Sequence, residues 1–330
     1  MSWSASLSTA IARRADLLAR CTAEGTDCYR LLHGIAEGEP GLCVDRYGPL
    51  LLVQTFREPL PADDVPRLAD QVAAALGARL TVVCNHRGAP TDVPPHEPDP
   101  AAHEGHLCHE RGVRFHIRAR HRGQDPWLFL DLRAGRAVVQ QLAAGKRVLN
   151  LFAYTCGVGV VAAVGGARLA HNVDFARSAL DVGLANATAN GVADRCTVLQ
   201  SDCLPVLRQL AGLPVQRRGK HVPFVKVARE PWDLVVLDPP RFAKGPFGTV
   251  DVVRDYPSLF KPALLALAPG GAILATNHVP TVTAADWHDV LRRCADKAGR
   301  PLRALQPIEV DADFPSFDRN PPLKMVLASV

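Results

Sequence analysis

The feature that most constrains this chain is a short apolar strand that leads through a glycine turn into an apolar helix. The strand covers residues 148–152, the turn covers 155–159, and the helix resumes at Val160. Such a unit directs backbone N–H groups, beside the small Gly157 and Gly159, towards a ligand. A single glycine turn occurs in many doubly wound proteins, so the acids at the ends of later strands carry more weight. These acids are Asp174, Asp202 and Asp238.

From Trp127 onward, apolar runs alternate with helical periods, which is the pattern of a doubly wound α/β domain. The expected strands cover residues 148–152, 168–173, 196–200, 232–238, 272–276 and 323–330. The expected helices cover residues 132–142, 160–165, 176–190, 204–210, 256–267 and 284–298. We therefore predict an α/β fold in which residues 123–330 form a doubly wound, Rossmann-like domain.

The chain before this domain has a different pattern. Residues 1–26 are predicted to form a basic amphipathic helix, and residues 27–122 a small α+β domain. The clearest elements of that domain are strands at 50–56 and 80–84 and a helix at 64–76. Residues 103–110 are rich in His, Glu and Cys but lack the ligand spacing of zinc motifs, so a loop or strand edge is expected there, without a metal.

Two stretches of basic residues are candidates for contact with RNA. In residues 112–122, apolar side chains alternate with cations, as in a strand with one buried and one polar face. That row suits a phosphate backbone, and it also suits a solvated edge strand protected by charge. An insertion at 212–231 is basic too, and there RNA contact and a solvated loop are both open interpretations. The cations assigned to RNA in these stretches are Arg114, Arg118, Arg120, Arg217 and Arg218.

Composition limits the classes of function. The 330 residues contain no apolar run of about 18 residues, so no membrane-spanning helix is expected. The nine cysteines form no C-x-x-C pair, which indicates reduced thiols and a cytoplasmic protein. The N-terminus lacks the pattern of a secretory signal, and an organelle transit peptide remains an alternative to the amphipathic helix. The net charge of +5 allows a polyanionic partner without requiring one.

The spacing of the acids fits a nucleotide-like ligand at the carboxyl ends of the strands. Asn150 and Asp174 lie 24 positions apart (174 − 150), which spans one βαβ unit, so a carboxylate there can accept both ribose hydroxyls. NAD would fit as well, but the turn 155–159 lacks the full G-x-G-x-x-G spacing. Asp202 ends the third strand, where an acid can accept from an adenine amino group. Asp238 ends the fourth, and the two prolines after it remove N–H donors and leave oxygen acceptors for a planar base.

This order of motifs resembles the class I S-adenosylmethionine (SAM) dependent methyltransferases. The matching pieces are Leu151-Phe-Ala-Tyr-Thr-Cys-Gly157, Val173-Asp174, Ser201-Asp202 and Asp238-Pro-Pro-Arg-Phe242. Gly123-Gln124 and Phe129-Leu-Asp-Leu-Arg133 are similar to a segment of the ribosomal RNA large-subunit methyltransferase I family, and residues 33–48 resemble the opening of its small central domain. The resemblance covers most of residues 28–330. The chain departs from that family in Asp125-Pro126, which replaces Lys-Thr-Gly, and we expect no PUA RNA-binding domain.

The resemblance implies a role for each matched residue. Asp174 takes the ribose of SAM, Asp202 lies near the adenine, and Phe129 and Arg133 help to close the site. The residues assigned to the methionine end of SAM, or grouped with them as cofactor-binding, are Asn150, Phe152, Tyr154, Thr155, Gly157 and Gly159. The floor against the acceptor base is formed by Asp238, Pro239, Pro240, Arg241 and Phe242.

A missing cysteine decides which chemistry we predict. Methylation of cytosine at carbon 5 needs a thiolate that adds to carbon 6. In the cytosine enzymes of the resembled family that cysteine follows the strand after the Asp-Pro-Pro motif, and here His278 stands in its place. Cys294 lies on an apolar helix face and is expected in the core. A nitrogen acceptor needs mainly alignment and desolvation, so Asn277 and His278 are predicted to bind the base edge, with strand capping as the alternative.

We therefore predict a SAM-dependent methyltransferase that acts on RNA, with ribosomal RNA as the expected class, at a base nitrogen. The alternatives are a methyltransferase for a small molecule or a protein, and an idle module that binds SAM or RNA. A NAD-dependent dehydrogenase is a more distant alternative. No membrane partner is expected, and the sequence leaves a homodimer open.

Overall fold

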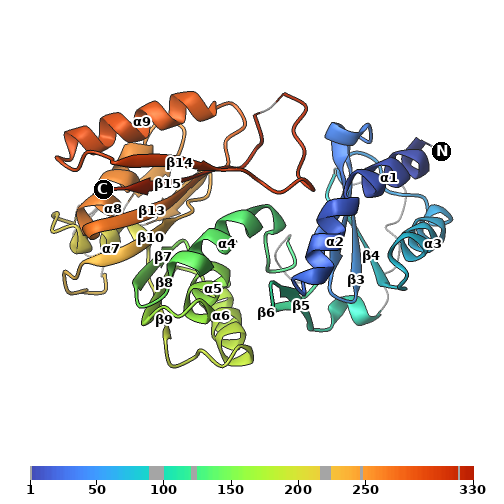
Figure 1. Cartoon of the computed structure of the whole chain (residues 1–330), viewed down its shortest axis with the longest axis horizontal. Helices are drawn as coiled ribbons and strands as arrows, with labels where there is room; N and C mark the ends of the chain where they lie inside the picture. Colours follow the sequence, from blue (N-terminus) through green and yellow to red (C-terminus); the bar gives the residue numbers. More distant parts are fainter. Residues whose placement is uncertain (1, 89–99, 120–124, 216–223, 246–247, 319) are drawn as a thin grey trace. The chain divides into compact units, whose positions relative to one another are not determined.

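The computed structural model describes residues 2–88, 100–119, 125–215, 224–245, 248–318 and 320–330. The chain divides into two compact units (Figure 1), namely Met1–Asp131 with Asp311–Phe317, and Leu132–Val310 with Asp318–Val330. The sequence analysis placed boundaries after residues 26 and 122, and the structure corrects both. The N-terminal helices pack into the first unit, the second unit begins at Leu132, and a short segment near the C-terminus returns to the first unit.

The first unit begins with two helices, α1 (Ser2–Arg13) and α2 (Ala15–Ala23), where a single helix was expected. The break falls at Arg14, whose buried guanidinium donates to the two oxygens of Glu37 at 2.6 and 2.8 Å. A charge buried this deeply needs a well-placed partner, because burial removes it from water. On either side of the break, Leu7 and Leu17 enter the apolar core of the unit.

A four-stranded sheet supports these helices. Its order is β1 (Cys28–His33), β2 (Leu42–Tyr47), β3 (Leu50–Thr55) and β4 (Thr81–His86). The first three strands pair antiparallel, whereas β4 runs parallel to β3 after the crossover helix α3 (Asp64–Leu76). A short 3-10 turn, η1 (Gly34–Glu37), follows β1. The small α+β arrangement expected from the sequence is therefore present.

A two-stranded hairpin follows the sheet and the 3-10 turn η2 (Pro100–His103). It pairs β5 (His106–Glu110) with β6 (Val113–Ile117). The predicted alternation in β6 is confirmed, because Phe115 is buried with its apolar neighbours while Arg114 is exposed. Within the residues that the structure describes, no group of three His, Cys, Asp or Glu side chains could hold a metal ion.

The returning segment, Asp311–Phe317, is held by charged groups of the first unit. The buried Asp313 accepts from the backbone N–H of Arg30 at 3.0 Å, and its carbonyl accepts from Arg14 at 3.1 Å. The Arg30 guanidinium lies over the ring of Phe314, 4.7 Å from its centroid. Arg30 is also held by the carboxylate of Asp45 at 2.7 and 3.0 Å.

The second unit contains a seven-stranded sheet of the order β14-β15-β13-β10-β7-β8-β9. Five of its strands are parallel neighbours, and β15 pairs antiparallel with β13 and β14. The strands are β7 (Arg147–Leu151), β8 (Leu169–Asp174), β9 (Cys196–Gln200), β10 (Trp232–Leu237), β13 (Leu267–Asn277), β14 (Ala304–Ile308) and β15 (Lys324–Ser329). The doubly wound fold is thus confirmed, with β14 as a strand that the sequence analysis did not expect.

Helices cover both faces of this sheet (Figure 1). They are α4 (Arg133–Leu142, after the 3-10 turn η3, Leu130–Leu132), α5 (Gly157–Val164), α6 (Arg177–Ala189), α7 (Cys203–Leu210), α8 (Tyr256–Ala266) and α9 (Ala284–Lys297). Odd-numbered side chains such as Leu149, Leu237 and Ala275 share one apolar core with α7, α8 and α9. Because side chains alternate along a strand, even-numbered residues of β10 and β13 such as Leu234 and Leu274 lie on the opposite face, whereas in β15 the even-numbered Val326 and Ala328 join the core with α7, α8 and α9.

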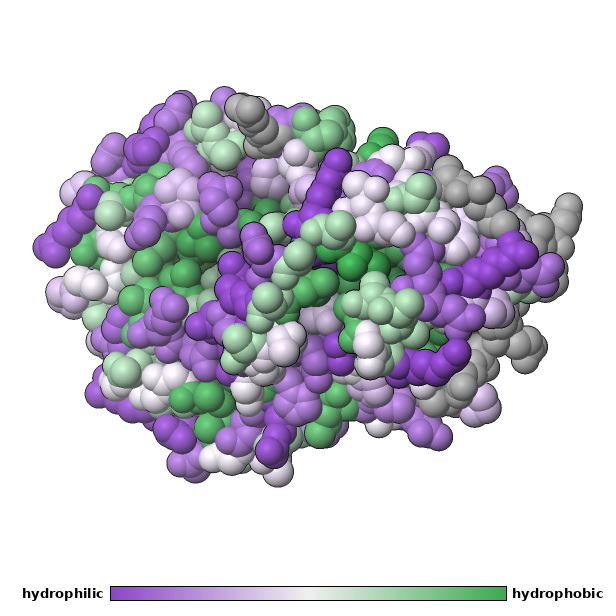
Figure 2. All heavy atoms as spheres, turned by 45° about the vertical axis from the view of Figure 1, so that its right-hand side comes forward, coloured by the Kyte–Doolittle hydropathy of each residue, from purple (hydrophilic) through white to green (hydrophobic). Residues whose placement is uncertain are grey.

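Two further observations complete the fold. A second short hairpin, β11 (Phe242–Gly245) with β12 (Gly248–Asp251), follows β10 and was not expected from the sequence. Among the described residues, no helix is both long and apolar enough to cross a bilayer. On the face drawn in Figure 2, hydrophilic and apolar side chains are intermixed.

Candidate active site

The sheet order reverses between β7 and β10, and this reversal positions the candidate site. From β7 the chain moves outward to β8 and β9, then returns to β10 on the other side of β7. The register pairs Leu237 of β10 with Leu151 of β7 and Val173 of β8 with that same Leu151. The segments that follow these strands therefore begin side by side. Open α/β sheets bind their ligands at such a reversal, outside the carboxyl ends of the strands.

The loop after β7 has an unusual backbone. Phe152, Tyr154 and Cys156 have φ values of 57°, 49° and 58°, in the left-handed region that non-glycine residues seldom adopt. Each such residue costs on the order of 1–3 kcal/mol and persists only where its surroundings fix it. The N–H groups of Phe152, Ala153, Tyr154 and Cys156 all donate within the protein, and this backbone positions the N-terminus of α5, which follows it. The sequence analysis assigned this loop to the methionine end of SAM.

Neighbouring elements hold that loop in place. The Phe152 N–H donates to the Sγ of Cys203 at 3.2 Å, and the Tyr154 N–H donates to Oδ2 of Asp174 at 2.8 Å. The carbonyl of Thr155 accepts from the Nδ2 of Asn186 on α6 at 3.1 Å. These bonds come from three different elements, so the strained conformation is fixed by tertiary structure.

Asp174 ends β8 and is largely buried, with 6% of its surface exposed. Besides the bond from Tyr154, its Oδ1 accepts from the N–H of Ala176 at 2.9 Å. Each carboxylate oxygen has a second lone pair, so the group can support the loop and still accept from a ribose hydroxyl. Phe175, the next residue, is 71% exposed, and the sequence analysis did not single it out. The sequence signal that could have identified Phe175 was its position as an aromatic residue directly after Asp174.

Asp202 has a structural role at the start of α7. It is the N-cap of that helix, and its side chain accepts from the N–H of Leu204 at 2.9 Å. Burial raises the pKa of Asp202, and the bond from Leu204 lowers it by less, so the pKa lies above its ordinary value. Contact with adenine remains a prediction for this residue.

Asn150 and Gly159 both contact Asn172 of β8, and their assignment to the cofactor remains a prediction. Asn150 is buried inside β7, and its Nδ2 donates to Oδ1 of Asn172 on β8 at 2.9 Å. A Cβ on Gly159 would overlap that same side chain of Asn172. Gly159 therefore lets α5 approach the sheet. From the sequence alone, a polar residue that pairs within the sheet looks the same as one that binds a ligand.

The end of β10 carries the second half of the site. Asp238 accepts at Oδ1 from the hydroxyl of Thr276, and the Nε2 of His278 lies 2.7 Å from the same oxygen. Burial raises the pKa of Asp238, but the charges and hydrogen bonds of His278, Thr276 and Arg136 outweigh it, so the pKa lies below its ordinary value. Asp238 is therefore a carboxylate in the neutral pH range. Because it is ionised, the Nε2 of His278 is the donor in this pair.

Thr276 and Arg136 were missed by the sequence analysis. Thr276 lies on β13 two positions before His278, which directly follows the strand, and both side chains contact Oδ1 of Asp238. Tyr256 supports that strand end, because its hydroxyl donates to the carbonyl of Thr276 at 2.8 Å. Arg136 is buried on α4, one turn after Arg133, which is buried too. A cation within the periodic part of the helix at 132–142 was the available signal.

Asn277 does not join His278, and this corrects their joint assignment to the base edge. Its side chain is buried on the opposite side of β13, where it lines a pocket with Trp287 of α9. The Oδ1 of Asn277 accepts from the N–H of Val279 at 2.9 Å. Asn277 is the last residue of β13, between Thr276 and His278, and the side chains of these two neighbours reach Asp238 from the other face.

The remaining predicted residues are placed as follows. Pro239 is buried and Pro240 exposed, and the exposed Arg241 lies over the ring of the exposed Phe242, 5.3 Å from its centroid. Phe129 is half exposed and belongs to the first unit. Arg118 lies 5.7 Å from the ring centroid of Trp127. Arg120, Arg217 and Arg218 lie outside the described residues.

The residues present fit SAM on two observations. The loop at 152–156 leads into the N-terminus of α5, and a helix N-terminus attracts a negative group such as the carboxylate of an amino acid. Asp174 and the exposed ring of Phe175 stand at the end of the neighbouring strand, which suits a ribose and a planar base. Residues 152–156, the N-terminus of α5, Asp174 and Phe175 are the groups that would hold the cofactor.

Comparisons with known proteins identify the family of this chain. The family model for S-adenosylmethionine-dependent methyltransferases matches residues 29–329. A Deinococcus radiodurans protein named "Ribosomal RNA large subunit methyltransferase" is 30% identical over 320 residues, which cover 92% of this chain and 72% of that protein. A Pseudomonas paraeruginosa protein named "Ribosomal RNA large subunit methyltransferase K/L" is 33% identical over 304 residues, which cover 89% of this chain and only 38% of that longer protein.

A solved structure supports the fold. The structure of a candidate SAM-dependent methyltransferase from Streptococcus mutans superposes with a TM-score of 0.74 at 21% identity, and the match covers 98% of this chain and 81% of that one. The family match spans nearly the whole sequence, and the doubly wound fold agrees with it. The chain therefore belongs to the family of S-adenosylmethionine-dependent methyltransferases, enzymes whose cofactor is SAM.

Proposed function

We propose that this methyltransferase acts on RNA, with ribosomal RNA as the substrate class, and that the acceptor is a base nitrogen. The substrate class is supported by relatives named as ribosomal RNA large subunit methyltransferases. Exposed Arg241 and Phe242, directly after the Asp-Pro-Pro motif, supply a cation and an aromatic face at the site. Unstacked RNA bases are commonly held on such faces.

The chain's own residues bind and orient the cofactor. SAM, when bound, supplies a methyl group on a positively charged sulfur. The N-terminus of α5, with residues 152–156 that position it, would hold its amino-acid end, Asp174 its ribose and Phe175 its adenine. Pro240 is exposed beside them, and its rigid ring would limit the positions open to the acceptor base. Alignment of this kind supplies much of the rate enhancement in a direct transfer.

One observation carries the nitrogen assignment, namely the pairing of His278 with Asp238 where a cytosine carbon-5 enzyme would need a thiolate. The described cysteines of the second unit are Cys156, Cys196, Cys203 and Cys294, and all four are buried. Burial raises the pKa of each of these thiols. A thiol with a raised pKa has little thiolate at neutral pH and is a poor nucleophile.

A base nitrogen brings its own lone pair and needs no nucleophile from the enzyme, and a nitrogen that bears a hydrogen must also lose a proton. Asp238 holds the Nε2–H of His278 and fixes the orientation of that ring. In the neutral ring, the other nitrogen, Nδ1, has a lone pair that can accept the proton released by the methylated nitrogen. Thr276 positions Asp238 through its own hydrogen bond.

The proposal is tested by incubating large-subunit ribosomal RNA with methyl-labelled SAM and digesting the product to nucleosides. The expected result is label on a nitrogen-methylated base. Label on 5-methylcytosine would refute the nitrogen assignment, and label that enters only small molecules or protein would refute the RNA substrate.

A matched variant tests the role of His278. His278→Gln can still donate to Asp238 but has no lone pair to take up a proton at neutral pH. Loss of a general base typically lowers the rate by about 100-fold or more, so kcat should fall by that order while SAM affinity is retained. Full activity in His278→Gln would contradict the proton-transfer role and leave only a positioning role.

A further inference from the structure

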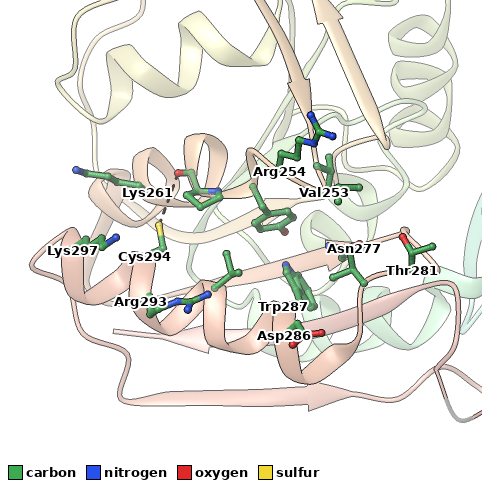
Figure 3. Close-up of a pocket in the computed structure, with 15 residues that line it drawn as sticks. Val253, Arg254, Lys261, Asn277, Thr281, Asp286, Trp287, Arg293, Cys294 and Lys297 are labelled. Carbon is green, nitrogen blue, oxygen red and sulfur yellow. Dashed lines mark hydrogen bonds between the residues drawn. The ribbon is translucent and has the colours of Figure 1, made fainter.

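A cavity lies on the side of the sheet opposite to His278, between α8, α9 and the segments that lead into them. Its volume is about 560 Å³. Figure 3 shows residues from α8, from the end of β13 and from α9 lining it. Asn277 and Trp287 lie together near the start of α9, while Arg293 and Lys297 lie towards its end.

The buried part of this pocket has two hydrogen-bond donors without an acceptor. The Nδ2 of Asn277 and the Nε1 of Trp287 are buried and have no hydrogen-bond partner. Both residues are 1% exposed and both line the cavity. Buried polar atoms in folded proteins nearly always have partners, so two such donors in one pocket point to a ligand with acceptor oxygens.

The rim of the pocket is strongly basic. Its four cations are all exposed, and they are Arg254, Lys261, Arg293 and Lys297. Among the described lining residues, Asp286 is the one acid, and its carboxylate already accepts from the hydroxyl of Thr283 at 2.7 Å. The first turns of α8 and α9 also contribute to the lining, and the N-terminus of a helix attracts negative charge.

The length of the basic row distinguishes an extended anion from a compact one. Trp287 and Lys297 are ten residues apart on α9 (297 − 287), which corresponds to about 15 Å along the helix axis. Arg293 and Lys297 are one turn apart, or about 6 Å. A single phosphate ion cannot reach both ends of this row, whereas a chain that carries a phosphate on each unit can.

We infer that the α8–α9 pocket binds the sugar–phosphate backbone of the RNA substrate next to the methylated base. Acceptor oxygens of the backbone meet Asn277 and Trp287, and Arg293 and Lys297 neutralise the phosphates that follow. This inference rests on the proposed RNA function. Asn277 is the last residue of β13 and His278 follows it directly, so the proton acceptor and the phosphate contact lie on opposite sides of the same strand end.

The test uses the intact protein and RNA that the wild type methylates. In Arg293→Gln/Lys297→Gln, RNA affinity should fall, and the slope of log affinity against log salt should become shallower by about 1.4, since each phosphate contact with a single strand contributes about 0.7. Arg292→Gln/Arg303→Gln removes the same charge from exposed positions outside the pocket and should leave the slope unchanged. Equal slopes in the two double variants would overturn the inference.

A second variant addresses the buried donor. Asn277→Asp keeps an oxygen for the N–H of Val279 and replaces the unpartnered NH₂ with a negatively charged oxygen. RNA affinity should fall at least tenfold, while the SAM-induced rise in melting temperature shows that the fold and cofactor site persist. Undiminished RNA affinity in this variant would also overturn the inference.

The remaining outcomes separate this inference from the proposed function. If the wild type binds SAM but neither binds nor methylates RNA, the proposed function is wrong, and so is the assignment of RNA to the α8–α9 pocket. If inorganic phosphate stabilises the wild type but not Arg293→Gln/Lys297→Gln, while both bind RNA equally, the pocket is a site for a small anion and the RNA assignment is wrong.

Discussion

The hydrogen bond from Thr276 to Asp238 allows a quantitative prediction about the acid at the centre of the site. Thr276→Val replaces a fully buried hydroxyl with a methyl group of similar size and leaves Asp238 with His278 as its partner. A hydrogen bond to a charged acceptor contributes roughly 1.5–3 kcal/mol. A shift of one pKa unit corresponds to about 1.4 kcal/mol, so the pKa of Asp238 should rise by about one to two units.

The sign follows from the direction of the natural shift. The bond from Thr276 is among the interactions that lower the pKa of Asp238, because it stabilises the ionised form. Its removal favours the protonated acid, so the acid limb of the pH–activity profile should move to higher pH by the same amount. Carbon-13 NMR of the aspartate carboxyl groups measures the pKa directly, and the pH dependence of kcat/KM measures its consequence.

Thr276→Ser is the matched control, because it keeps the hydroxyl and removes only a methyl group. It should titrate like the wild type. If Thr276→Val leaves the acid limb in place, or if Thr276→Ser shifts it equally, then the reasoning that links this hydroxyl to the charge on Asp238 is wrong. A mere loss of stability would not move the limb, so the readout separates electrostatic positioning from a packing defect.

Two further predictions concern the stability of each unit. Burial and the neighbouring Arg30 hold the pKa of His33 at about 4 in the folded protein, against 6.5 for the free side chain. His33 therefore stays neutral in the folded protein but becomes protonated in the unfolded chain, so the free energy of unfolding should fall by about 3 kcal/mol as the pH drops from 6.5 to 4. In denaturant titrations, His33→Gln should make this dependence on pH weaker. Gly159→Ala should destabilise the protein by about 1–3 kcal/mol, because the added methyl overlaps Asn172; a double-mutant cycle with Asn172→Ala should show a smaller loss, and a strictly additive cycle would contradict the contact.

The polar side chains at the end of β13 lie on two opposite faces of the strand. Thr276 and His278 face Asp238, and Asn277 faces α9. In the two proposals, one strand end holds the proton acceptor on one side and contacts the RNA backbone on the other. The predicted effects of His278→Gln on kcat and of Asn277→Asp on RNA affinity follow from this division.

The sequence by itself determined the class of fold and the region of the site. Apolar runs at 148–152 and 232–238 predicted buried parallel strands. The carboxyl ends of parallel strands lie at the same edge of a sheet, so the acids at the ends of such strands were expected at that edge. The alternation in β6 likewise followed from the two-residue period of a strand. The family resemblance rested on these same local motifs.

Only the tertiary structure decided what each polar residue near those strand ends contacts. Asn150 and Asn277 carry the same amide and lie at similar places near strand ends, yet one bonds to Asn172 within the sheet and the other lines the α8–α9 pocket. The return of Asp313 to the first unit depends on Arg14 and Arg30, nearly 300 residues earlier in the chain (313 − 14 = 299). Local sequence fixes a residue's secondary structure and the face it occupies, but its partner belongs to another element that only folding brings near.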